Sequence, residues 1–583
     1  MNDSGWFDDS TLDERFPAWT RGNAADVFPE PFSPLGHSLV LDAMSTGLRD
    51  GYIAIGALDY SEFVNPEQPD LFKMFGGYPY NPLTMTRILG ARMPGATPEM
   101  IDRAFFDERD EVPPYEHHDW HDSPRHEAKL GASMAWAMST DALPNLDADR
   151  ALARRLREDR PDLASLTDSA LHARARSMVP YIQQTFENAM IVSSLSALGT
   201  GALGAVCEGL GDQTMAIRLL AGIEVDSSAP SHAMWELSRL AQRTPAVMAA
   251  FEAGADQTLE KLRASNDPDA MNFVTRFDRF LFDHGSRAQN EYDPRSSSWE
   301  VEPRIALLAI DLMRRSDDSL SPSNRAAAAV AERDRIAVEV RDRIASDPET
   351  AALFEAALQS ARLFLAGRER AKTNVVRVIN ELRVALREYG QRLVAQGVVE
   401  QAEHVFMVTN AELDQLRAEP EAFKEIIAQR WTAYRNLFEY EPVFVVNGRV
   451  PSLGEMTRRD AKVSTKATAG TVLTGAAGSG GVASGRAAIV RDAAHPEGFE
   501  PGDVLVAPQT DPSWIPLMVA ASAVVVNVGA QGSHAMIVSR ELGIPCVVSV
   551  AGGTDIIPAG AMVTVNGTAG TVTIDTVTID TVP

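Results

Sequence analysis

The sequence predicts a multidomain protein in which a large, mainly α-helical domain precedes a small α/β domain. From about residue 125 to 440, Ala, Leu, Arg and Glu dominate, and apolar residues recur at the three- and four-residue spacings of a helix. After Pro451, short β-branched runs alternate with helical patterns, which is typical of an α/β fold. We expect the helical domain over residues 1–463, a connector over 464–479 and the α/β domain over 480–583.

The clearest helix begins after Asp347, which has the side chain of an N-cap residue. Pro348 suits the first helical position, and Glu349 places a negative charge in the first turn, where the helix dipole favours it. The apolar pattern continues toward Gly397, a residue that commonly ends helices. So long a helical stretch without strands favours a bundle-like domain.

The segment that follows the helical region is rich in Ala, Thr, Gly and Ser and is predicted to be a flexible connector. Beyond it, five strand-like runs alternate with two helical patterns. The expected strands are Ala487–Val490, Val504–Ala507, Ala523–Val528, Cys546–Val550 and Met562–Val565, and the expected helices are Ser513–Ala521 and His534–Leu542.

Composition excludes several classes of protein. A chain of 583 residues predicts two to four domains. The net charge of -26 argues against a nucleic-acid-binding protein or one that binds anionic membranes. The two cysteines, Cys207 and Cys546, lack metal-ligand spacing, so we expect neither a disulfide framework nor a metal site. The N-terminus has no secretory signal pattern, which predicts a cytoplasmic protein, and the apolar run Ile191–Cys207 is interpreted as buried packing.

His534 is the residue most informative about chemistry. The strand-like run Ala523–Val528 and a glycine-containing turn precede it, and a helical pattern that continues to Leu542 follows it. The unpaired N–H groups and the positive end of the dipole at a helix N-terminus favour an anionic group. A neutral imidazole at this place can accept a phosphoryl group and transfer it.

Residues 477–574 resemble the swivelling phosphohistidine domain of the phosphoenolpyruvate-utilising enzymes, a family that includes rifampicin phosphotransferase and phenylphosphate synthase. The resemblance is carried by several segments in order. They are Gly478–Ala487, Gly502–Val506, Thr510–Trp514, Gly529–Glu541 and Arg540–Val548.

The resemblance implies that His534 is the phosphorylated residue. It also implies that Gly529, Gly532 and Ser533 support the phosphoryl group, although the family usually has Thr, Ser or Asn where this chain has Gly532. Arg540 is either a charge support for that group or a packing residue.

The helical region is similar to the substrate-side region of the same family. Asn23 with Pro31–Leu35, Tyr80-Asn81 with Met93–Gly95, and His404–Leu413 carry this similarity. The helical pattern begins near residue 16, and neither an ATP-grasp domain nor a P-loop is recognisable. The resemblance therefore implies that a separate ATP-grasp subunit binds ATP and Mg²⁺, as in phenylphosphate synthase.

These features predict a phosphotransferase component that carries a phosphoryl group on His534 to a phenol or alcohol hydroxyl. A non-catalytic phosphocarrier or regulatory protein of the same family is the alternative. An acceptor hydroxyl needs a base, and the candidates are His37, His117, His118 and His121. The histidine-rich segment could equally be a hydrated polar loop or a set of metal ligands, although no metal site is expected from its spacing.

Overall fold

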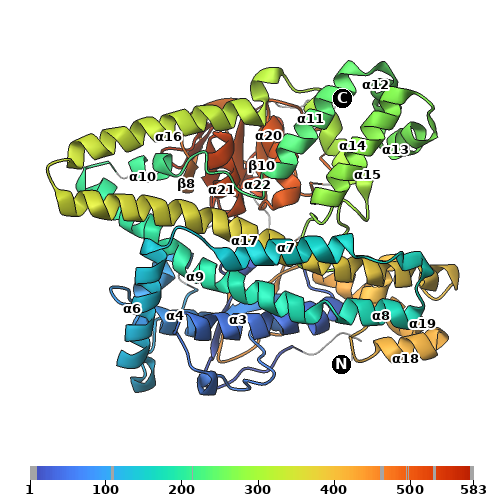
Figure 1. The fold of residues 1–583 in the computed structure, drawn as a ribbon, viewed down its shortest axis with the longest axis horizontal. Helices are drawn as coiled ribbons and strands as arrows, with labels where there is room; N and C mark the ends of the chain where they lie inside the picture. Colours follow the sequence, from blue (N-terminus) through green and yellow to red (C-terminus); the bar gives the residue numbers. More distant parts are fainter. Residues whose placement is uncertain are drawn as a thin grey trace. The chain divides into compact units, whose positions relative to one another are not determined.

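The computed structural model describes residues 9–106, 111–212, 214–459, 465–493, 495–496, 498–529 and 533–577. These residues form two compact units (Figure 1). The first unit comprises Met1–Leu198, Asn290–Ser296 and Leu363–Val463, and the second comprises Gly199–Gln289, Ser297–Arg362 and Ser464–Pro583.

The first unit is mainly helical. Its helices, or parts of helices, are α1 (Ala24–Val27), α2 (Pro34–Gly36), α3 (Asp42–Ala54), α4 (Leu83–Arg92), α5 (Pro98–Phe106), α6 (Pro124–Ser139), α7 (Pro144–Glu158), α8 (Asp168–Arg176), the start of α9 (Val179–Gly209), the end of α17 (Pro348–Ala395), α18 (Leu413–Ala418) and α19 (Pro420–Leu437). Helix α17 begins where the sequence predicts, because Asp347 Oδ1 accepts the N–H groups of Glu349 and Thr350.

A small antiparallel sheet accompanies these helices, in the order β2-β3-β1-β5. Its strands are β2 (Lys73–Phe75), β3 (Tyr78–Pro82), β1 (Ala18–Thr20) and β5 (Val445–Asn447). A two-stranded ribbon is formed by β4 (Tyr440–Glu441) and β6 (Thr457–Arg458). Trp19, Tyr78, Tyr80, Tyr389 and Tyr434 are among the largest fully buried side chains of this unit's core.

The second unit contains further helices and the α/β region. The helices are the end of α9, α10 (Thr214–Leu219), α11 (Ala229–Arg243), α12 (Pro245–Glu252), α13 (Ala255–Ala264), α14 (Pro268–His284), α15 (Pro303–Arg314), α16 (Pro322–Ile344) and the start of α17, followed in the α/β region by α20 (Ile515–Ala520), α21 (His534–Leu542) and α22 (Gly553–Ile556).

The α/β region is built on an eight-stranded sheet in the order β7-β14-β13-β9-β10-β11-β12-β8. The strands are β7 (Val472–Thr474), β14 (Thr571–Thr576), β13 (Met562–Asn566), β9 (Val482–Ile489), β10 (Val504–Ala507), β11 (Ala523–Val526), β12 (Cys546–Val548) and β8 (Ala476–Ser479). The pairs from β9 to β12 are parallel, and the outer pairs are antiparallel.

Successive side chains of a strand point to opposite faces of the sheet. The two faces of this sheet therefore pack into two different hydrophobic cores. Val504 and Val506 of β10 lie in one core, while Leu505 and Ala507 lie in the other with α20 and α21. This second core continues into the helices of residues 229–313, where α20 packs against α15. Arg325 of α16 donates to the carbonyl oxygen of Val519 at 2.9 Å and thereby caps the end of α20.

Two expectations about domain boundaries need correction. The helical region is not one domain over 1–463, because residues 199–289 and 297–362 pack with the α/β region. The expected connector over 464–479 contains the strands β7 and β8 instead of flexible chain. Its small residues allow close strand packing: a Cβ on Gly478 would lie 2.9 Å from the carbonyl oxygen of Cys546.

Helix α9 is part of a long apolar helical span. One helical span, Asp168–Gly209, has the length and apolarity of a membrane-spanning helix, with a mean hydropathy of 1.7 over an 18-residue window. Core helices of soluble proteins pass the same test. Cys207 lies in this helix, and burial raises the pKa of its thiol to about 11, as it does for Cys546 on β12.

Candidate active site

His534 is the first residue of α21, as the sequence predicts. Ser533 precedes it in an extended conformation and is the N-cap residue of this nine-residue helix. The imidazole is therefore attached to the helix end at which the free N–H groups and the dipole favour an anion. The residue is largely buried, with 9% of its surface exposed.

The ring of His534 is held by a threonine from the loop after β10. Thr510 Oγ1 lies 3.1 Å from His534 Nδ1, and both residues are buried. When Nδ1 carries the proton and donates it to Thr510, the lone pair of the neutral ring is on Nε2, the nitrogen that can attack phosphorus. Thr510 was part of the sequence resemblance, but sequence reasoning did not assign it a role.

The turn before His534 is tightly packed. A Cβ on Gly529 would lie 3.0 Å from Val548 Cβ and 3.1 Å from Ser533 Oγ, so a side chain there would require these neighbours to shift slightly. The Gly529 carbonyl oxygen accepts the hydroxyl of Ser549 at 2.6 Å. Ser533 Oγ is buried and has no hydrogen-bond partner among the residues that the structure describes. Gly532, the other predicted support, lies outside the described residues.

Arg540 contacts the sheet. Its Nε donates to the carbonyl oxygen of Gly478 on β8 at 2.7 Å, and its Nη2 lies 3.5 Å from Met536 Sδ. Burial lowers the pKa of the guanidinium. These contacts favour the packing role over the charge-support role, because the groups that the described structure places beside Arg540 are on β8, on β12 and within α21.

Three of the four candidate base residues lie together in the first unit. The His121 ring centroid lies 5.1 Å from that of His118 and 6.0 Å from that of His117. Tyr115 Oη is 2.6 Å from His121 Nδ1. Burial, followed by the charges of His118, His117 and Arg92, lowers the pKa of His121 to about 4.

The remaining candidates are more exposed. His117 Nε2 lies 3.3 Å from Asp122 Oδ2 at the surface. His37 begins the helical turn before α3 and lies 3.9 Å from Asp42 Oδ1, apart from the three clustered histidines in sequence. His121 is thus the buried and neutral member of the set, while His37 and His117 are open to solvent.

A second polar cluster was missed by sequence reasoning. Residues Asn290–Ser296 form a loop of the first unit that carries the fully buried carboxylate of Asp293. Asp293 accepts the N–H of Ser33 at 3.0 Å and its hydroxyl at 2.6 Å. Arg295 donates to Glu30 at 2.8 Å. The signal in the sequence that could have identified this loop is a run of polar and charged residues between two helices.

The same loop contacts α17 through charged side chains. Glu291, of which 2% is exposed, lies 3.3 Å from Lys372 Nζ. Arg383 is fully buried and donates to the carbonyl oxygens of Glu291 at 2.7 Å and Asp293 at 3.2 Å. Buried charges are unfavourable unless they pair with one another, as these side chains do. Buried clusters of charged residues are also common at functional sites.

Comparisons with known proteins agree with this fold. Residues 499–570 match the family described as PEP-utilising enzyme, mobile domain, and residues 183–369 match the family described as rifampicin phosphotransferase fourth domain. The chain is 27% identical over 578 residues to an uncharacterized protein of Mycobacterium tuberculosis, covering 96% of this chain and 62% of that protein.

Two relatives have informative names. The prodigiosin synthesizing transferase PigC of Serratia marcescens is 28% identical over 57% of this chain and 37% of its own length. A rifampicin phosphotransferase of Streptomyces sviceus is 32% identical over 36% of this chain and 24% of its own length. The chain thus spans less than two thirds of the length of these relatives.

Several of the relatives are named as phosphotransferases, and one of the two matching families is named after rifampicin phosphotransferase. The matches over residues 183–369 and 499–570 support the phosphoenolpyruvate-utilising enzyme family, and the second match places the similarity to its mobile domain in the α/β region.

Proposed function

We propose that this chain is a phosphotransferase component in which His534 carries the phosphoryl group. In the first half-reaction, Nε2 of the neutral imidazole attacks a phosphorus of ATP, so that an N–P bond forms as a P–O bond breaks. An ATP-grasp partner would bind ATP and Mg²⁺ and supply the cationic stabilisation that phosphoryl transfer needs.

In the second half-reaction, a small-molecule hydroxyl takes the phosphoryl group from His534. The O–P bond forms as the N–P bond breaks, the hydroxyl proton goes to a base, and the neutral imidazole is regenerated. We propose a phenol or an alcohol as the acceptor and the first unit as the part that binds it. Its buried, charged loop around Glu291 and Lys372 is the part best equipped to position a polar ligand.

The observation that carries this proposal is the placement of His534. A buried imidazole at the first position of a nine-residue helix, with Nδ1 held by Thr510, leaves Nε2 as the reactive nitrogen. The helix end favours the added phosphoryl charge, and the fixed ring lowers the entropic cost of reaction. In this proposal the mobile domain moves between the ATP-binding partner and the acceptor, and domain motion of this kind commonly gates catalysis.

The test is phosphorylation of the intact protein. The full chain is incubated with ATP labelled in its β- and γ-phosphates, Mg²⁺ and candidate ATP-grasp proteins, and the label is mapped by mass spectrometry at alkaline pH. We expect an acid-labile phosphate on His534 that is absent from His534→Asn and retained in His495→Asn, a change at an exposed histidine of the same domain.

The acceptor step is tested with the labelled protein. Discharge of label to a panel of phenols and alcohols would support the transferase, whereas label that reaches His534 and is discharged to none would favour the phosphocarrier alternative. Failure to label His534 with any ATP-grasp partner would overturn both.

A further inference from the structure

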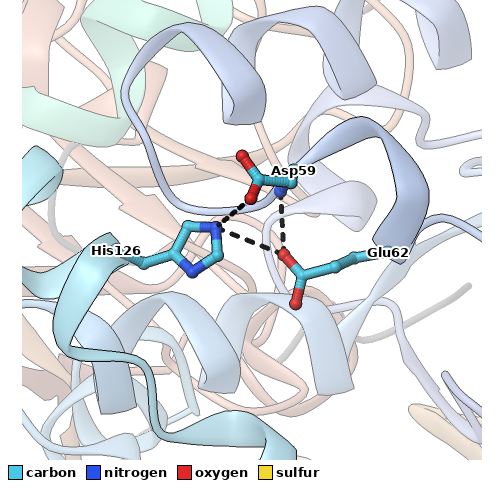
Figure 2. A group of neighbouring side chains, drawn as sticks. All are labelled: Asp59, Glu62 and His126. Atoms are coloured by element: carbon cyan, nitrogen blue, oxygen red, sulfur yellow. Dashed lines mark hydrogen bonds and ion pairs between the residues drawn. The ribbon is translucent and has the colours of Figure 1, made fainter.

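Three residues of the first unit converge on one point that the proposed function does not use. Asp59 and Glu62 flank the short turn after α3, and His126 lies in the first turn of α6 (Figure 2). Their ligand atoms all lie within 4.8 Å of one another. Two carboxylates and an imidazole form a donor set suited to first-row transition metals and zinc.

The distances from His126 to the two carboxylates fit tetrahedral metal coordination. His126 Nε2 lies 3.4 Å from Asp59 Oδ2 and 3.3 Å from Glu62 Oε2. With zinc–ligand bonds of about 2.0–2.2 Å, adjacent ligands of a tetrahedron are about 3.3–3.6 Å apart. The imidazole nitrogen therefore stands where a zinc ligand would stand relative to both oxygens.

His126 supplies the second, independent observation. The residue is 5% exposed, and its Nε2 forms no hydrogen bond with the described residues. Although two carboxylate oxygens are close (Figure 2), neither is aligned to accept an N–H from that nitrogen. A buried ring nitrogen close to two carboxylates and without a hydrogen bond is stabilised either by protonation of the ring or by a cation that lies between the three groups.

A hydrogen bond of the other ring nitrogen, Nδ1, orients the His126 ring so that Nε2 can bind a metal. His126 Nδ1 lies 2.7 Å from Ser123 Oγ, the N-cap residue of α6. Metal-bound histidines usually donate their second ring N–H to an oxygen in this way, which fixes the tautomer and points the lone pair at the metal.

Basic side chains already neutralise the two carboxylates, and they divide into a buried and an exposed set. Arg92 is buried and holds both oxygens of Glu62, at 2.7 and 3.1 Å. Arg125 and Lys129 contact Asp59 at 3.0 and 2.9 Å, but their side chains are 70% and 39% exposed. Arg15, with 35% of its side chain exposed, lies 3.7 Å from Glu62 Oε1. A cation would displace the exposed Arg125 from Asp59 Oδ2. It would also replace Arg92 Nη1 at Glu62 Oε2, while Arg92 Nη2 keeps its bond to Glu62 Oε1.

We propose that Asp59, Glu62 and His126 bind one Zn²⁺, with a fourth position open to water. The site would connect the turn after α3 to the start of α6 and so stabilise the first unit, because a ligand that binds the folded state raises its stability. The side-chain exposure of Asp59, 27%, leaves a path to solvent for that water.

The test uses the full chain, treated with a chelator and titrated with Zn²⁺ by calorimetry. We expect one Zn²⁺ per chain, a rise in melting temperature, and the intense visible bands of tetrahedral coordination when Co²⁺ replaces Zn²⁺. His126→Gln and Asp59→Asn should each weaken binding at least about tenfold, since a ligand is removed, while His495→Gln should bind as the unaltered protein does.

Two results would overturn the proposal. One is the absence of stoichiometric Zn²⁺ binding to the unaltered chain. The other is a Zn²⁺ affinity that is unchanged in both His126→Gln and Asp59→Asn. If His117→Gln then abolishes Zn²⁺ binding, the metal is bound by the neighbouring histidines instead. Asp59→Asn keeps the test decisive if His126→Gln fails to fold, because Asp59 is partly exposed.

Discussion

Thr510 Oγ1 lies 3.1 Å from His534 Nδ1, and this hydrogen bond ties the loop after β10 to the first turn of α21. Thr510→Val keeps the shape of the side chain and removes the hydroxyl. We expect the rate of His534 phosphorylation to fall about two- to thirteenfold, since one neutral hydrogen bond contributes about 0.5–1.5 kcal/mol.

Thr510→Ser is the matched control, because it keeps the hydroxyl. Single-turnover labelling with the ATP-grasp partner measures both variants. Equal rates for Thr510→Val and the unaltered protein would show that the hydrogen bond does not position the ring.

Arg540 is expected to act on stability and not on chemistry. Arg540→Met removes the donor to the Gly478 carbonyl oxygen inside the α/β region. Calorimetry should show a loss of about 1.5–3 kcal/mol, the contribution of a hydrogen bond that involves a charged group. The exposed Arg491, changed to Met, should cost less than about 1 kcal/mol. A phosphorylation rate that drops in folded Arg540→Met and recovers in Arg540→Lys would instead assign Arg540 to the phosphoryl group.

Asp293 should be essential to the stability of the first unit. Asp293→Asn removes a buried negative charge that accepts two hydrogen bonds from Ser33 and lies beside Arg295. Arg295 keeps its ion pair with Glu30, so the expected cost is that of weakened charge-assisted hydrogen bonds, about 1.5–3 kcal/mol, and thermal unfolding should begin at a lower temperature. Asp492→Asn, at the surface, is the control and should change stability by about 0.5 kcal/mol or less. Similar unfolding of both variants would contradict the assignment.

His121 should make the protein sensitive to mild acid. Unfolded His121 binds a proton near pH 6.5, whereas the folded residue does so only near its pKa of about 4. Between these values the unfolded state binds more protons, so stability is retained above pH 6.5 and lost as the pH falls toward 4. We expect this loss, about 1–3 kcal/mol, to shrink in His121→Gln when urea unfolding is followed from pH 7 to pH 4. Parallel curves for the two proteins would contradict the prediction.

The sequence was sufficient to place His534, because the relevant signals are local. A β-branched run, a glycine turn and a helical pattern predict a histidine at a helix N-terminus, and α21 begins at that residue. The start of α17 after Asp347 was predicted for the same reason.

The boundary of the α/β region could not be read in this way. Gly475 and Gly478 belong to a composition that usually indicates flexible chain, yet β8 pairs with β12 and a side chain on Gly478 would collide with the Cys546 backbone. Here the small residues permit close backbone approach, which depends on a partner strand about 70 residues away.

The polar loop from Asn290 to Ser296 was missed for a related reason. Its role arises from contacts with Ser33 and with Arg383, which are distant in the chain. No periodic pattern identifies such a loop, because its side chains are paired individually and not along one face of an element.

The two buried cysteines have a practical consequence. A thiol with a pKa of about 11 is ionised in roughly one molecule in ten thousand at pH 7, and both Cys207 and Cys546 are also shielded from solvent. Maleimide dyes should therefore react with a cysteine introduced at an exposed position in preference to either native one. Donor and acceptor fluorophores can thus be attached to the native background, and energy transfer between them would report directly on movement of the domain that carries His534.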